Sequence, residues 1–139
     1  MIDKQSFYHG AALVRVVEDN RCRSIVKSEL GFVVNGDVFV YLKYTTKGRT
    51  PWRFQFASEE ILYLNSAAKR WPKVTIAFVC GGDGICGLTW QQVVGLIGNN
   101  AGWVCCRRKF NEQYGVAGSQ GEIKGKVTLQ QWPNLIFQN

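Results

Sequence analysis

The sequence is poor in the residues that build metal and redox sites. It contains one histidine, His9, and no Cys-x-x-C pair. Structural zinc needs about four Cys or His ligands at close spacing, so we expect neither a metal ion nor a cofactor. The cysteines are odd in number and several lie in apolar, strand-like segments, which indicates small buried hydrophobic residues in a reducing compartment. They are Cys22, Cys80, Cys86, Cys105 and Cys106.

Long apolar runs are also missing. The longest, such as Ile76–Cys80, have about five residues, against the roughly 20 that a membrane-spanning helix needs. Residues 1–5 lack the basic-then-apolar order of a secretory signal. The sequence therefore predicts a cytoplasmic protein without a membrane partner.

Acidic residues are few relative to basic ones. Ten Asp and Glu face 17 Lys and Arg, which gives a net charge of +7. Such a charge attracts polyanions at long range, although it also serves as an ordinary solubilising surface. The cations fall into four clusters, at Arg21, Arg23 and Lys27; at Lys43, Lys47, Arg49 and Arg53; at Lys69, Arg70 and Lys73; and at Arg107, Arg108 and Lys109.

The first half of the chain predicts two helices and three strands. Residues 6–19 favour a helix, although the alternation at 13–17 leaves a strand open, and the stripe Phe7, Ala11, Val14 and Val17 is its expected buried face. Asn35-Gly36 predicts a hairpin turn between 32–34 and 38–42. A strand is expected at 52–56 and a helix at 58–71, with the buried stripe Ile61, Leu64, Ala68 and Trp71.

The second half predicts mainly strands. Residues 73–80 and 85–88 flank a glycine-rich turn at 81–84, and Thr89 with Gln92 forms a capping box for a helix over 90–97. Further strands are expected at 102–107, 114–116, 122–129 and 135–137. We expect one α+β domain over residues 1–139, with a curved mixed or mainly antiparallel sheet packed with two or three helices.

Three segments resemble a group of small uncharacterised bacterial proteins. They are His9-Gly10-Ala11-Ala12-Leu13, then Asn35-Gly36-Asp37 with Tyr41–Lys47, then Val79–Cys86, and the likeness spans about residues 9–97. The resemblance implies no known activity.

The element order in this region also resembles the core of restriction-endonuclease-like nucleases, in which an acidic residue and an acid-x-Lys triplet bind Mg²⁺. This resemblance would make Asp37 the acid and Lys43 the lysine. The triplet here reads Tyr41-Leu42-Lys43 and lacks its carboxylate, and a phenol is no substitute for a hard anionic ligand. It therefore implies a scaffold without hydrolysis, unless Glu18, Asp19 or Glu29 supplies a displaced carboxylate.

Other catalytic patterns are weak. His9 is the only base available to a cysteine nucleophile, and nothing in the sequence pairs it with one. The turn Gly81-Gly82-Asp83-Gly84 lacks the Lys-Ser/Thr of a phosphate-binding loop. We assign no catalytic residue.

Aromatic residues interleave with cations around 41–53 and 103–110, a pattern typical of proteins that stack single-stranded bases and hold phosphates. Our leading hypothesis is a nucleic-acid-associated binding domain without hydrolytic activity. Two alternatives stay open: a homodimeric protein- or ligand-binding module, and a nuclease with a rearranged acidic site. The proposed nucleic-acid-binding residues are Lys43, Lys47, Arg49, Arg53, Arg107, Arg108 and Lys109.

Overall fold

The computed structural model describes residues 1–139 and contains two sheets and four helices. The larger sheet has five strands in the order β1-β2-β3-β5-β6. Neighbouring strands are antiparallel except β3 and β5, which pair in parallel. The strands are β1 (Ile25–Ser28), β2 (Gly31–Val34), β3 (Val38–Thr45), β5 (Lys73–Cys80) and β6 (Gly84–Thr89).

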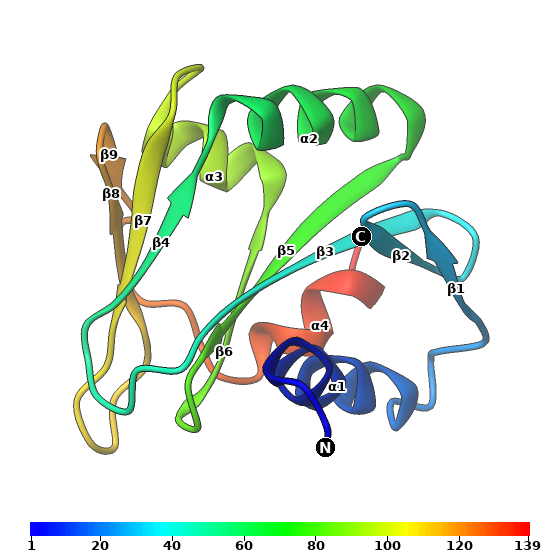
Figure 1. The fold of residues 1–139 in the computed structure, drawn as a ribbon, viewed down its shortest axis with the longest axis horizontal. Helices are drawn as coiled ribbons and strands as arrows, with labels where there is room; N and C mark the ends of the chain where they lie inside the picture. Colours follow the sequence, from blue (N-terminus) through cyan, green and yellow to red (C-terminus); the bar gives the residue numbers. More distant parts are fainter.

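The second sheet has four antiparallel strands in the order β4-β7-β8-β9. Together with α2 (Ser58–Arg70) and α3 (Trp90–Ile97), it covers one face of the larger sheet (Figure 1). Its own outer face carries no helix (Figure 1). Its strands are β4 (Trp52–Phe56), β7 (Gly102–Arg107), β8 (Gly115–Gly118) and β9 (Gly121–Glu122).

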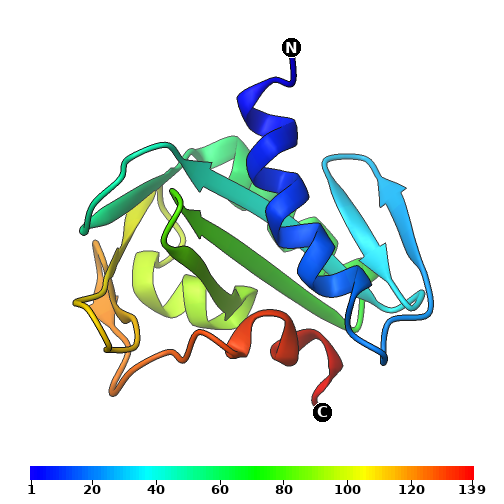
Figure 2. The same cartoon turned by 90° about the horizontal axis from the view of Figure 1, so that it is seen from below.

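Helices α1 (Lys4–Val17) and α4 (Gln131–Phe137) lie across the other face of the five-stranded sheet (Figure 2). Alternation along β5 supplies both cores: Ile76, Phe78 and Cys80 point towards the second sheet, whereas Ala77 and Val79 point towards α1 and α4. A central strand buried on both faces therefore reads as a mostly apolar segment without alternation of apolar and polar residues, as residues 73–80 do.

Several sequence predictions are confirmed, including the α+β class. Asn35 and Gly36 both have positive φ between β2 and β3, and Val34 pairs with Val38, so the connection has three residues instead of two. The Thr89 hydroxyl accepts from the Gln92 backbone at 3.1 Å while the Gln92 side chain accepts from the Thr89 backbone at 2.9 Å, which completes the capping box.

The helix at 6–19 is also confirmed, but its predicted buried stripe is wrong. Phe7, Val14 and Val17 face solvent, whereas Ala12 and Val16 are buried and Tyr8 stacks on Tyr44 at 5.2 Å. Both faces of this helix are apolar, so helical periodicity alone does not select the one that meets the sheet. In α2 the buried third residue is likewise Ala67, not Ala68.

The last two predicted strands, at 122–129 and 135–137, are wrong. Residues 135–137 lie in α4, a fourth helix. Strand β9 is residues 121–122 and so includes only residue 122 of the expected strand at 122–129, of which Val127 forms one isolated bridge with Tyr114. Short apolar runs fit either helix or strand, and packing decides between them. Here Gly87 provides the space, because a Cβ at that position would lie 2.6 Å from Leu135 Cδ2 in α4.

Candidate functional site

The single histidine and the buried cysteines lie apart. Cys80, Cys86 and Cys106 face the core between the two sheets, whereas His9 on α1 packs edge-on against Tyr44, on the other side of the larger sheet. Hydrogen bonds with Cys80 and Cys86, together with burial, raise the pKa of the Cys106 thiol. A protonated, buried thiol is a poor nucleophile, so this cluster is suited to packing rather than catalysis.

The two residues that the nuclease resemblance singles out do not meet. Asp37 precedes Val38, which pairs with Lys73, while Lys43 lies six residues further along the same chain segment, or about 20 Å at strand spacing. No three His, Cys, Asp or Glu side chains gather in an arrangement that could hold a metal ion. The geometry therefore gives the nuclease hypothesis no support.

Lys43 instead belongs to an internal polar cluster between β3 and α2. Its ammonium donates to Glu60 at 2.8 and 3.1 Å, and the Tyr41 hydroxyl donates to the same carboxylate at 2.6 Å. Burial opposes ionisation of Glu60, but the bonds from Lys43, Tyr41 and the Ala57 N–H prevail, so the pKa of Glu60 lies below its usual value. Lys43 is therefore neutralised internally.

Arg108 is also held internally. Its guanidinium donates to both oxygens of Asp83, at 2.6 and 2.8 Å, and the Tyr114 hydroxyl donates to Asp83 at 2.8 Å. These bonds, above all those from Arg108, hold the pKa of the Asp83 carboxyl below its ordinary value in spite of burial. The pair anchors the connection between β7 and β8 to the turn between β5 and β6.

The loop between β3 and β4 is anchored beside it. The Lys47 carbonyl oxygen accepts a hydrogen bond from Trp52 Nε1 at 2.9 Å. It packs so closely on Gly81 that a Cβ added to Gly81 would lie 2.2 Å from this oxygen. The Arg108 N–H donates to the Thr50 hydroxyl at 3.2 Å. Two segments 58 residues apart in sequence thus lie side by side, and both were predicted to be basic.

A basic pocket opens where these segments meet. Its volume is about 330 Å³ and none of its lining residues is hydrophobic. Three of its cations, Arg107, Lys109 and Lys126, belong to none of the four ion pairs of the molecule, and Glu112 is the one acidic residue. The full lining is Thr50, Pro51, Arg107, Arg108, Lys109, Glu112, Gly115 and Lys126.

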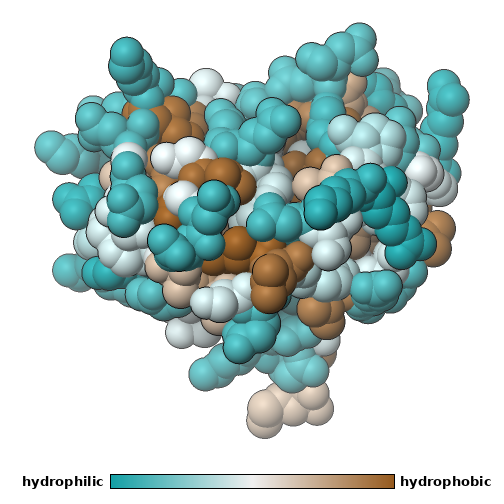
Figure 3. Space-filling view, turned by 90° about the horizontal axis from the view of Figure 1, so that it is seen from above, coloured by the Kyte–Doolittle hydropathy of each residue, from teal (hydrophilic) through white to brown (hydrophobic).

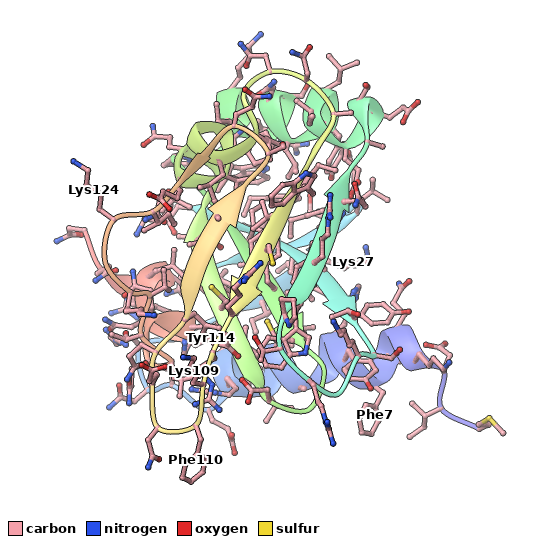
Figure 4. All side chains as sticks on the ribbon, turned by 90° about the vertical axis from the view of Figure 1, so that its left-hand side faces the viewer. Phe7, Lys27, Lys109, Phe110, Tyr114 and Lys124 are labelled. Carbon is pink, nitrogen blue, oxygen red and sulfur yellow. The ribbon has the colours of Figure 1, made fainter.

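The basic pocket continues onto the uncovered outer face of the second sheet. Alternation on β4 and β7 turns Arg53, Trp103 and Arg107 to this side, and the Arg53 guanidinium lies 4.4 Å from the centre of the Trp103 ring. On the connection from β7 to β8, Lys109 and Phe110 lie at the tip, whereas Lys124 lies away from them on the segment after β9 (Figure 4). Phe110 is 88% exposed.

A larger pocket of about 730 Å³ lies on the other side of the molecule, by the C-terminal residues. Two of its three cations already have partners: Arg21 binds Asp19, and Lys73 donates to the carbonyls of Leu135 and Gln138. Arg23 alone is uncommitted. Size therefore does not make this pocket the stronger anion site.

The structure divides the seven predicted binding residues into groups. Arg107, Arg108 and Lys109 line the basic pocket, Arg49 is exposed on the adjoining loop, and Arg53 lies on the neighbouring sheet face. Lys47 donates to the Pro51 carbonyl at 2.8 Å, and Lys43 faces Glu60. The aromatic–cation pattern at 103–110 included Phe110, which the structure leaves exposed. Sequence reasoning missed Lys126, because Lys126 joins the pocket through the bridge between Tyr114 and Val127.

No family model matches this chain, and neither a curated protein nor a solved structure was found to be similar to it. None of the four helices has the length and apolar character required to cross a lipid bilayer.

Proposed function

We propose that this protein binds single-stranded nucleic acid through the basic pocket and the adjoining outer face of the second sheet. The observation that carries the proposal is the meeting of Arg107, Lys109 and Lys126, cations without ion-pair partners, around one pocket that has no hydrophobic lining residue and lies beside the exposed Phe110 ring. Cations of this kind neutralise phosphates, and each phosphate contact releases a condensed counterion.

Single strands fit this surface better than duplex. Phe110 presents a ring on a loop tip, and Trp103 presents one on the sheet with Arg53 stacked over it. Unpaired bases stack on such rings whatever their sequence, because every base has a π-face. Bases within a duplex are already stacked and do not reach a ring on a loop.

The proposal relies on Arg107, Lys109 and Lys126, with Arg49 and Arg53 as neighbours. Lys43 and Arg108 have structural roles, since each forms an ion pair with a carboxylate of the same chain. Arg108 contributes by fixing the loop that carries Lys109 and Phe110.

The test is fluorescence anisotropy with labelled oligo(U) and oligo(dT) of about 20 nucleotides, a length chosen to exceed one binding site. The wild type is compared with the triple variant Arg107→Ala, Lys109→Ala and Lys126→Ala. The matched control removes three exposed cations from elsewhere, as Arg23→Ala, Lys69→Ala and Arg70→Ala. Both variants have the same net charge.

For the wild type we expect binding that weakens steeply between about 50 and 200 mM salt, and a slope about two units shallower in the triple variant, since each single-strand phosphate contact contributes about 0.7. The control should keep the wild-type slope. Undetectable wild-type binding at about 50 mM salt refutes the proposal, as does an equal loss in both triple variants, because charge alone would then explain the affinity.

A further inference from the structure

Helix α1 presents an apolar stripe to solvent. Five of the nine exposed large hydrophobic residues of the molecule lie within its first 17 positions. Phe7 is 63% and Val14 is 52% exposed, although both lie within a well-formed helix. In Figure 2 the helix is the outermost element on its side of the sheet, and no other segment covers it.

The spacing of this stripe is that of a helix-pairing seam. Lys4, Phe7, Ala11, Val14 and Glu18 follow intervals of three, four, three and four residues, which places them on one face of the helix. Apolar side chains form the middle of the seam, and one charge of each sign ends it. The opposite face of α1, with Ala12 and Val16, is already buried against the sheet.

The charges at the two ends of the seam indicate which partner helix fits it. Neither Lys4 nor Glu18 takes part in any of the four ion pairs. A two-fold axis beside Ala11 would place Lys4 of one protomer near the partner's Glu18, and Phe7 near the partner's Val14. In a two-fold interface every such contact occurs twice, so the seam is complementary to a second copy of itself.

Small residues at the centre allow the two helices to approach. Ala11 lies at the crossing, and a Cβ added to its neighbour Gly10 would meet nothing within 4 Å. A helix from an unrelated protein would need matching apolar spacing and charges of reversed order, both of which a second copy supplies by symmetry.

We propose that the protein forms a homodimer in which the α1 helices of two chains pack antiparallel along the seam Lys4, Phe7, Ala11, Val14 and Glu18. One helix pair buries a small area, so we expect a reversible dimer with a Kd on the order of 10 µM. The proposal is independent of nucleic-acid binding, because it uses none of the residues of the basic pocket.

Sedimentation velocity over a concentration series, without nucleic acid, tests it. Phe7→Glu and Val14→Glu should each raise the dimer Kd at least about tenfold, because they set two charges in an apolar seam. The matched control is Leu62→Glu on α2, where Leu62 is 69% exposed. The surface over α2 and α3 mixes hydrophilic side chains with small apolar patches (Figure 3), and the control should keep the wild-type Kd.

A charge exchange tests the antiparallel arrangement. Lys4→Glu alone and Glu18→Lys alone should each raise the dimer Kd about fivefold, because each change turns two attractive charge pairs into repulsive ones. The double variant restores attractive pairs, so its Kd should return most of the way to the wild-type value. Circular dichroism should show the same helix content throughout, since all of these side chains are exposed.

Three results overturn the proposal. The first is a wild type that stays monomeric at several hundred micromolar, including one that instead floats with anionic vesicles, which would make the stripe a membrane contact. The second is a control Leu62→Glu that weakens the dimer as much as Phe7→Glu does. The third is a double charge exchange that leaves the Kd as high as the single variants do.

Discussion

Arg108 and Asp83 form a two-bond ion pair, from Nη2 to Oδ1 at 2.6 Å and from Nε to Oδ2 at 2.8 Å, with side chains only 16% and 20% exposed. The pair connects two segments of the chain that are 25 residues apart in sequence. Because the backbone of the same arginine also binds Thr50, this one residue holds together the three connections around the basic pocket.

Asp83→Asn should therefore destabilise the fold by about 1.5–3 kcal/mol at neutral pH, the range for hydrogen bonds to a charged group. Asn keeps the shape and loses the charge. Urea denaturation at pH 7 measures the effect, with Glu112→Gln, an exposed neighbour, as the control. A wild-type unfolding curve for Asp83→Asn would show that the pair contributes nothing.

The same pair predicts a pH dependence. The pKa of Asp83 is lowered in the folded protein from 3.8, so its contribution to stability is fully present above about pH 4 and is lost as pH falls through the lower folded value. The difference in unfolding free energy between wild type and Asp83→Asn should shrink between about pH 4 and pH 2. A difference that stays constant over this range would contradict the assignment.

Gly81→Ala should distort the basic pocket. Gly81 has φ of +55°, and its added Cβ would lie 2.2 Å from the Lys47 carbonyl oxygen. We expect a loss of more than about 1 kcal/mol in stability and weaker oligonucleotide binding, because the displaced loop carries Arg49 and Thr50. Gly82→Ala is the matched control, since its Cβ would meet nothing within 4 Å. Equal behaviour of the two variants would show that the loop adapts.

Lys43→Met should separate structure from binding. It leaves Glu60 without its cation and should cost about 2 kcal/mol of stability, while the salt slope of oligonucleotide binding stays as in the wild type. Thermal denaturation and the anisotropy series measure the two quantities. A shallower slope with unchanged stability would return Lys43 to the binding surface.

Phe110→Ala should weaken nucleic-acid binding and leave the stability of the fold nearly unchanged. At 88% exposure the ring contributes little to the fold, so stability should change by less than about 0.5 kcal/mol. Affinity for single strands should fall about tenfold, within the range of one lost base stack, and Phe110→Trp should retain it. Equal affinity of the Ala and Trp variants would exclude stacking on this ring.

Local signals in the sequence determined much of the fold. The run at 73–80, the Asn35-Gly36 turn and the Thr89–Gln92 box each act between neighbours in the chain, so they predict their elements without tertiary information. The incorrect predictions concern segments whose local sequence fits two alternatives equally well. Helix α1 has apolar residues all round, and residues 135–137 are too short a run to distinguish helix from strand.

The candidate site divides in the same way. Composition and clustering indicated a basic surface, and the structure shows that alternation along β4 leaves Arg53 and Gln55 exposed. Only the tertiary structure decided which cations are available, since Glu60 neutralises Lys43 and Asp83 neutralises Arg108 across 17 and 25 residues. Side-chain type and spacing are properties of the chain, but the partner of a charge depends on which distant segments the fold brings within a few ångströms of it.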